Sequence, residues 1–158
     1  APQAIPPLRQ LLAGGVEAAQ AVPGKPHLVQ PYEAIIEALG TLGAIEAQAE
    51  IKPFLAHPVA KVQLATARAL YQLTKEEKYG KRLINALQAE KLPLRRSALM
   101  DLGATDYLPA ASAIAQAAAE NSLKLISLKG LLENHLKNQD DELSQEAVNL
   151  LTMMDSLL

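Results

Sequence analysis

The chain has 158 residues, of which 49% are hydrophobic, 3% aromatic and 20% charged, and its formal net charge at pH 7 is −2. This hydrophobicity excludes a disordered chain, and the scarcity of aromatic residues argues against a strand-rich fold, because strands favour aromatic and β-branched side chains. The absence of cysteine excludes disulfides, a thiolate nucleophile and zinc–thiolate sites, and the near-neutral charge gives no general attraction to nucleic acid.

The first helix is predicted over Ile5–Leu12, where apolar residues recur at helical spacing. It resembles the second helix of a pair whose first helix is missing. Because the terminal unit of a repeat fold needs a polar outer side, we expect further chain or another subunit to cover its apolar residues. The segment Gly14–Pro31 is rich in glycine and proline and is predicted to be a long loop, either functional or simply solvated.

Repeats organise the chain from residue 32 onward. Related segments recur at a spacing of about thirty residues, each at the end of an amphipathic helical stretch: Glu37–Gly43, Arg68–Thr74 and Ser97–Gly103, with a looser copy that begins at Ser127. Proline marks the expected helix starts at Pro31, Pro58, Pro93 and Pro109. Gly40 is expected to allow close helix packing, and Gly103 is expected to cap a helix.

A single helix pair of this size cannot bury its apolar faces, whereas stacked pairs can. We therefore predict an all-α fold, a right-handed α-solenoid of about four to five HEAT-like helix pairs. The solenoid is expected to span residues 1–136. Residues 137–158 are expected to form a C-terminal capping or docking helix that opens at Asp140, Asp141 and Glu142.

Four segments carry a more specific signal than a generic repeat: Gly24–Leu42, Lys61–Thr74, Leu94–Thr105 and Ala119–Lys129. Together they resemble the E-type subunit of the phycocyanobilin lyases that act on the phycocyanin α-subunit. The resemblance extends from Ala1 to Leu136, and the residues from Lys137 onward show no such match. The family's chains are longer at the N-terminus, so the resemblance implies that this chain is the C-terminal part of a longer protein.

The resemblance also implies a function. E-type subunits are cyanobacterial HEAT-like proteins that pair with an F-type subunit, and the heterodimer attaches phycocyanobilin to a cysteine of the apo-phycocyanin α-subunit for phycobilisome assembly. A lyase active only with its partner is therefore expected, with phycocyanobilin as substrate and no covalently bound cofactor. Two alternatives stay open: a non-catalytic scaffold or chaperone that binds apo-phycobiliprotein, and a related bilin lyase that detaches or isomerises the chromophore.

The expected location follows from the same features. No apolar run approaches the roughly 18 residues that a membrane-spanning helix requires, and the first residues do not form a signal peptide. We expect a cytoplasmic cyanobacterial protein, associated with phycobilisomes at the thylakoid surface. Neither nucleic acid nor a membrane-spanning anchor is expected among its interactions.

Bilin transfer directs attention to basic residues, because the two propionates of the chromophore need cationic partners. Seven of the fifteen Lys and Arg residues fall in one stretch that ends at Arg96. Lys78, Lys81 and Arg82 precede or open the second helix of a pair and are candidates for binding the propionates or an acidic partner; a solvated charged face is the alternative. Arg95 is expected to tie adjacent repeats together, whereas Arg96 is a freer candidate for the same contacts.

Tyrosine and histidine supply the remaining candidates. Tyr79 and Tyr107 are predicted at turns between helices, where an aromatic ring can meet the bilin or a partner. Lys25 lies in the long loop and Tyr32 follows it; both are candidate binding residues, although Tyr32 also suits the core. His27, in the same loop, is the candidate that handles a proton in catalysis. The three histidines lie far apart and lack ligand spacing, so no metal site is expected.

Overall fold

The structure of the chain, a computed structural model, describes residues 2–15, 31–138 and 144–158. Every regular element in these ranges is a helix, so the predicted all-α fold is confirmed. The chain divides into two compact units, Ala1–Glu76 and Glu77–Leu158, and in each unit the helices pack as an α-solenoid of helix pairs requires. The expected boundary after residue 136, between the solenoid and a C-terminal capping or docking helix, stays a prediction.

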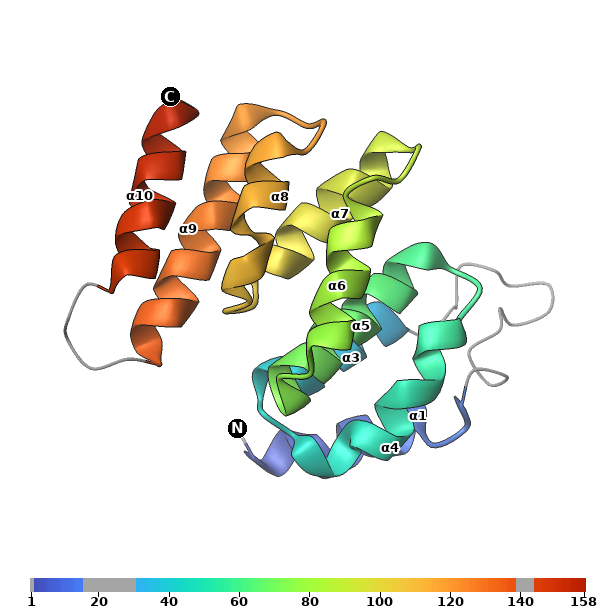
Figure 1. Cartoon of the computed structure of the whole chain (residues 1–158). Helices are drawn as coiled ribbons and strands as arrows, with labels where there is room; N and C mark the ends of the chain where they lie inside the picture. Colours follow the sequence, from blue (N-terminus) through green and yellow to red (C-terminus); the bar gives the residue numbers. More distant parts are fainter. Residues whose placement is uncertain (1, 16–30, 139–143) are drawn as a thin grey trace. The chain divides into compact units, whose positions relative to one another are not determined.

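The first unit contains, in chain order, η1 (Pro2–Ala4), α1 (Ile5–Leu12), α3 (Tyr32–Thr41), η3 (Ile45–Ala47), α4 (Gln48–Ile51), η4 (Lys52–Ala56) and α5 (Ala60–Thr74), where η marks a 3₁₀ helix. Its core lies where α3 and α5 pack against each other (Figure 1). Ile36, Leu39 and Leu70 are fully buried there. Gly40 permits the close approach, because a Cβ atom at this position would lie 2.8 Å from Ala69 Cα on α5. The predicted packing role of Gly40 is thus confirmed.

An ion pair joins α1 to α4 within this unit. Arg9 Nε and Nη2 donate to Glu50 Oε1 at 2.9 and 2.6 Å. Leu12, the last residue of α1, is buried, whereas Leu11 is 47% exposed. The expectation that further chain or another subunit covers this apolar surface stays a prediction.

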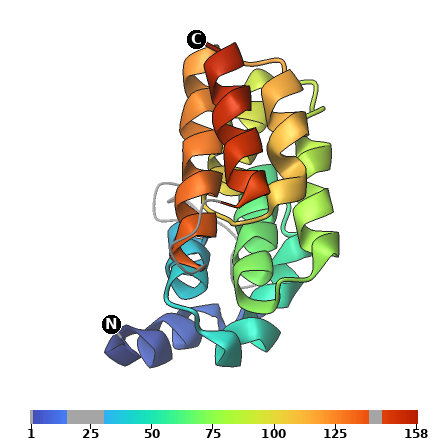
Figure 2. The same cartoon turned by 60° about the vertical axis from the view of Figure 1, so that its left-hand side comes forward.

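The second unit contains α6 (Glu77–Ala86), α7 (Leu92–Gly103), η5 (Leu108–Ala110), α8 (Ala111–Gln116), α9 (Asn121–Lys137) and α10 (Gln145–Ser156). The long helices α7 and α9 pack against each other, and α8 and α10 both contact α9. Figure 2 shows α10, in red, alongside α8 and α9, both in orange. This stacking covers the core residues Leu99, Leu128 and Leu131, which are fully buried.

The crossing of α7 and α9 corrects the expected role of Gly103. This residue is the last of α7, but the C-cap is Ala104, so the prediction that Gly103 caps the helix is wrong. Instead, a Cβ atom on Gly130 would lie 2.9 Å from the carbonyl carbon of Gly103, and one on Gly103 would lie 3.0 Å from Ser127 Cα. The two glycines bring the helix backbones together, and Ser127 Oγ donates to Leu99 O at 2.6 Å across the same contact.

The start of α10 also differs from the prediction. The helix begins at Gln145, and its N-cap is Ser144, whose Oγ accepts a 3.2 Å hydrogen bond from the Ala147 N–H. The predicted opening at Asp140, Asp141 and Glu142 lies outside the described residues. The Ser144 hydroxyl therefore satisfies a backbone N–H in the first turn of α10. Acidic side chains were expected from the sequence to stabilise the start of this helix through its dipole.

Candidate functional site

The cations of α6 share one face of that helix. Tyr79 and Leu83, one turn apart, are buried and so fix which side of α6 turns toward the core. Helical geometry then places Lys81 on the opposite side, with Lys78 and Arg82 flanking it; both lysines are exposed and the arginine is half-buried. The structure thus brings together three of the basic residues predicted for the site.

Tyr107 packs against the core-facing side of α6. A Cβ atom added to Gly80 would lie 2.6 Å from Tyr107 Cε2, so only glycine leaves room for the ring. The Tyr107 hydroxyl donates to Glu77 Oε1 at 3.3 Å. Burial, the negative charge of Glu77 and this hydrogen bond together raise the pKa of Tyr107 above its ordinary value.

The three candidate tyrosines are core residues. Tyr32, Tyr79 and Tyr107 are all less than 5% exposed. The Tyr32 ring packs against Phe54, with ring centroids 5.3 Å apart, and Lys78 Nζ lies 5.0 Å from the Tyr79 ring centroid. These contacts explain why the tyrosine rings are buried without requiring a bound ligand. The prediction that Tyr79 lies at a turn is wrong, because it lies inside α6, whereas Tyr107 lies at the turn before η5 as predicted; both rings are buried in the core.

Arg96 has a partner on the next helix pair. Its guanidinium binds both carboxylate oxygens of Glu120, with Nη2 to Oε1 and with Nε to Oε2 at 3.3 Å. These hydrogen bonds from Arg96 hold the pKa of Glu120 below its usual range. Because both side chains are exposed, the pair contributes little to stability and is screened by salt. Arg96 therefore links the starts of α7 and α9.

The hydrogen bonds of Arg95 confirm its predicted role in tying adjacent repeats together. Its Nε donates to Ala118 O, and its Nη1 donates to Ala89 O and Glu90 O, each at 2.8 Å. The side chain thus joins the segment before α7 to the segment before α9. One arginine satisfies three backbone carbonyls that would otherwise depend on water.

Lys25 and His27 lie outside the described residues. Among the residues that are described, no group of three His, Cys, Asp or Glu side chains is arranged to hold a metal ion. The two described histidines serve local structure: His57 Nδ1 accepts from the Val59 N–H at 3.0 Å, and His135 Nε2 lies 2.8 Å from Ser144 Oγ. None of the described helices combines the length and apolar character needed to cross a membrane.

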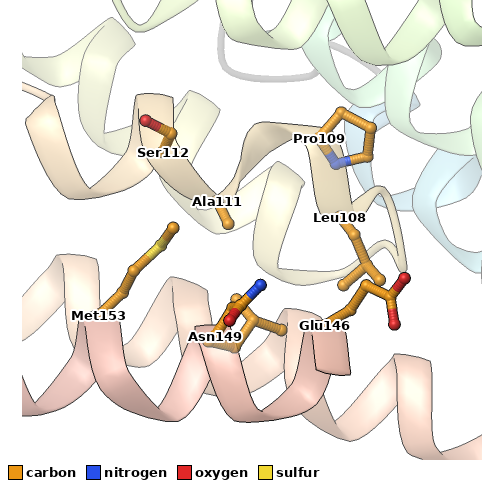
Figure 3. Close-up of a pocket in the computed structure, with 8 residues that line it drawn as sticks. Leu108, Pro109, Ala111, Ser112, Glu146, Asn149 and Met153 are labelled. Carbon is orange, nitrogen blue, oxygen red and sulfur yellow. The ribbon is translucent and has the colours of Figure 1, made fainter. Parts of the chain in front are cut away.

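A pocket between η5–α8 and α10 was not predicted from the sequence. It has a volume of about 180 Å³ and is lined by Leu108, Pro109, Ala111 and Ser112 on one side and by Glu146, Asn149, Leu150 and Met153 on the other. Figure 3 shows Glu146, Asn149 and Met153 pointing from α10 toward η5–α8, and Leu108 pointing toward α10. Its floor is apolar and its rim is polar, a combination typical of sites for small organic ligands.

Sequence reasoning missed the pocket because its two walls are separated by the whole of α9. A signal was present in α10, where Glu146, Asn149 and Met153 recur at helical spacing and form one face. That face mixes apolar and polar side chains, so it did not stand out from an ordinary amphipathic helix.

Comparison with known proteins shows which proteins the chain resembles. No family model matches the chain. A phycocyanobilin lyase subunit alpha from Picosynechococcus sp. is 62% identical over 156 residues, which cover 99% of this chain and 58% of the relative. A protein of the same name from Nostoc sp. is 56% identical over 155 residues, 97% of this chain and 56% of the relative. Over nearly its whole length, the chain resembles proteins named phycocyanobilin lyase subunit alpha.

A solved structure shows the same similarity. The complex of CpcE and CpcF of phycocyanin lyase from Nostoc sp. PCC7120 contains a chain with a TM-score of 0.89 and 56% identity, matched over 99% of this chain and 57% of that chain. The present chain thus spans a little over half the length of the phycocyanobilin lyase alpha subunits it matches. A Nostoc protein named bilin biosynthesis protein PecE is more distant, at 43% identity over 129 residues.

Proposed function

We propose that the chain is part of the E-type subunit of a lyase that attaches phycocyanobilin to a cysteine of the phycocyanin α-subunit. The supporting observation is the 62% identity over 99% of the chain with a protein named phycocyanobilin lyase subunit alpha. The similarity to a chain in the complex of CpcE and CpcF supports an F-type partner, with which the active heterodimer forms. In this proposal the enzyme works in the cyanobacterial cytoplasm, with phycobilisomes at the thylakoid surface.

The reaction requires only a few functions of the catalyst. The thiol of the acceptor cysteine adds across the exocyclic double bond of a terminal ring: the sulfur bonds to the exocyclic carbon, the π bond breaks, and a proton ends on the adjacent ring carbon. Because the acceptor protein supplies the nucleophile, the lyase binds the tetrapyrrole, orients it and handles a proton. Phycocyanobilin is a substrate, and the proposal requires no covalently bound cofactor.

The exposed face of α6 suits the propionates. Lys78, Lys81 and Arg82 lie together on it, and two carboxylates need at least two cationic partners. Arg82 can offer a planar, bidentate contact, whereas the lysines act as point charges. We include Lys25 and, as proton donor or acceptor, His27 in this proposal on sequence grounds.

The remaining candidates take subordinate roles in the proposal. Arg96 is bound to Glu120, so a propionate at Arg96 has to compete with this carboxylate. Tyr79 and Tyr107 support α6 through packing, since their rings are buried, whereas Tyr32 is a core residue of the first unit. Tyr79 in particular holds α6 in the orientation that presents its cations.

Bilin transfer to the acceptor tests the function. The full-length protein, its F-type partner, phycocyanobilin and apo-phycocyanin α-subunit are mixed, and a covalent adduct with red-shifted absorbance is expected. Omission of either lyase subunit should abolish the adduct. Binding of the acceptor without binding of free bilin would instead identify a scaffold or chaperone. The same assay on the His27→Gln variant should show slower transfer with an intact heterodimer; unchanged transfer would remove His27 from the mechanism.

A related bilin enzyme is the second candidate. The 43% identity with bilin biosynthesis protein PecE favours it over an unrelated activity, but this identity is lower than the 62% found for the lyase subunit. The absorbance spectrum of the product distinguishes the two, because an isomerised chromophore has a shorter conjugated system than attached phycocyanobilin. A product with the red-shifted spectrum of attached phycocyanobilin supports the first proposal.

A further inference from the structure

The pocket between η5–α8 and α10 has the character of a binding site for one end of the chromophore. We propose that it holds the terminal ring of the tetrapyrrole that does not react with the cysteine. This inference rests on the proposed function, which supplies the ligand class: a linear tetrapyrrole with a lactam ring at each end and propionates on the two middle rings. It assigns a substrate subsite to residues of η5, α8 and α10.

The size and lining of the pocket suit a single ring. A volume of about 180 Å³ is comparable with one alkyl-substituted five-membered ring and is far too small for the whole tetrapyrrole. Leu108, Ala111 and Leu150 provide apolar contacts, and Met153 is an unbranched, adaptable side chain that packs well against a flat π system. Burial of one apolar ring removes its surface from water and so favours binding.

The polar rim matches a lactam. A lactam carries one N–H donor and one carbonyl acceptor side by side, and the primary amide of Asn149 offers the complementary pair. Asn149 Oδ1 accepts one hydrogen bond, from Gln145 Nε2 at 3.1 Å, which leaves a lone pair for the lactam N–H. Its Nδ2 can donate to the lactam carbonyl, and Figure 3 shows this amide between Ala111 and Leu108.

A second donor is available on the opposite wall. Ser112 Oγ accepts from Gln116 Nε2 at 3.3 Å, so its hydroxyl hydrogen can point into the pocket. Glu146 adds a carboxylate at the rim, which can accept from the N–H of the next pyrrole ring. The rim thus contains acceptors for ring N–H groups and donors for a ring carbonyl, which a purely apolar ligand would not use.

The pocket is connected to α6 through Tyr107. Leu108, at the lip, follows Tyr107, whose ring packs on Gly80 of α6. A tetrapyrrole held in the pocket by one terminal ring leaves its propionate-bearing middle rings outside the pocket. Its other terminal ring stays outside, where the cysteine of a separate folded protein can reach it.

Substitutions at the pocket test the inference. Ser112 is exposed on α8, so the Ser112→Phe variant should fold and should fill the pocket with its ring. The matched control is Thr152→Phe, at an exposed position of α10 that does not line the pocket. Absorbance titration of the full-length protein and its F-type partner with phycocyanobilin should give a Kd raised about tenfold or more by Ser112→Phe and changed less than about twofold by Thr152→Phe.

A second variant and a second probe separate the pocket from the cations. Asn149→Leu keeps the volume of the side chain and removes the amide, and we expect it to raise the Kd about fivefold to tenfold. Phycocyanobilin dimethyl ester lacks both carboxylates, so its affinity should be insensitive to Lys81→Gln. Its affinity should still fall with Ser112→Phe, because the terminal ring is unchanged.

The outcomes distinguish this inference from the proposed function. Equal bilin affinity of the wild type and Ser112→Phe would overturn the pocket assignment, while transfer of bilin to the acceptor by the wild type would leave the lyase function standing. Pocket-dependent binding of bilin without transfer would support the subsite and overturn the lyase function. Absence of any bilin binding by the wild type would overturn both.

Discussion

At the scale of single residues, the glycines at helix crossings set how closely the helices approach. Gly40 faces Ala69 between α3 and α5, and Gly130 faces Gly103 between α7 and α9. At these positions an added Cβ atom meets backbone, which cannot rotate away as a side-chain tip can. The small residue in each repeat therefore reflects a steric requirement of the helix crossing.

Replacement of Gly130 by alanine should destabilise the second unit. A Cβ atom there would lie 2.9 Å from the Gly103 carbonyl carbon, so α7 and α9 must separate. Alanine favours a helix by about 1 kcal/mol, and overpacking of this kind costs about 1–3 kcal/mol and disrupts the Ser127–Leu99 hydrogen bond as well. We expect a net loss of about 1–2 kcal/mol in the free energy of unfolding, measured with urea.

The neighbouring residue provides the control for this prediction. Lys129 is exposed on α9 and pairs with Glu133 at 3.8 Å. Its replacement by alanine should change the free energy of unfolding by less than about 0.5 kcal/mol. If Gly130→Ala were as stable as Lys129→Ala, the close helix crossing would not be a requirement for stability.

At the scale of elements, the link between η5 and α6 depends on the Tyr107 side chain. Its ring covers Gly80, and its hydroxyl donates to Glu77. The pKa of Tyr107 is raised in the folded chain, so the fold favours the neutral phenol. The stabilisation from this phenol is complete below the unfolded pKa, about 10, and is lost as the pH rises through the folded pKa.

The variant Tyr107→Phe tests this link. It lacks the ionisable hydroxyl, so its stability should fall less than that of the wild type between about pH 9 and pH 11. At pH 7 we expect it to be less stable by about 1 kcal/mol, because it lacks the hydrogen bond to Glu77. Urea unfolding across this pH range provides the measurement, and Tyr79→Phe is the matched control. A parallel loss of stability in the wild type and Tyr107→Phe would contradict the role of the phenol.

The sequence predicted elements better than it predicted the site. Helical spacing and the repeat of small residues located the helix pairs, because both patterns are local consequences of burial and packing. The direction of the Tyr79 and Tyr107 rings depended on which side of α6 faces the core, and the role of Gly103 depended on a contact with α9. The pocket required two distant segments to meet, which no local pattern encodes.

At the scale of the whole molecule, the apolar surface of α1 bears on assembly. Leu11 is 47% exposed, and Leu8 is half-buried on the same helix, although Arg9 and Glu50 hold α1 in place. Exposed leucines on a held helix form a preformed apolar surface, and such surfaces mark sites of contact with other protein segments. The heterodimer in the proposed function requires at least one surface of this kind.

We expect the 158-residue chain by itself to associate with copies of itself or to bind an apolar dye through this surface. The variant Leu11→Lys should lower the average mass measured by light scattering and reduce the fluorescence of the bound dye, because a charged side chain opposes burial of the surface. Gln10→Lys adds the same charge at an adjacent exposed position and serves as the control. A monomeric wild-type chain that binds no dye would show that the leucines of α1 do not form a contact surface. Equal effects of the two variants would assign any change to charge alone.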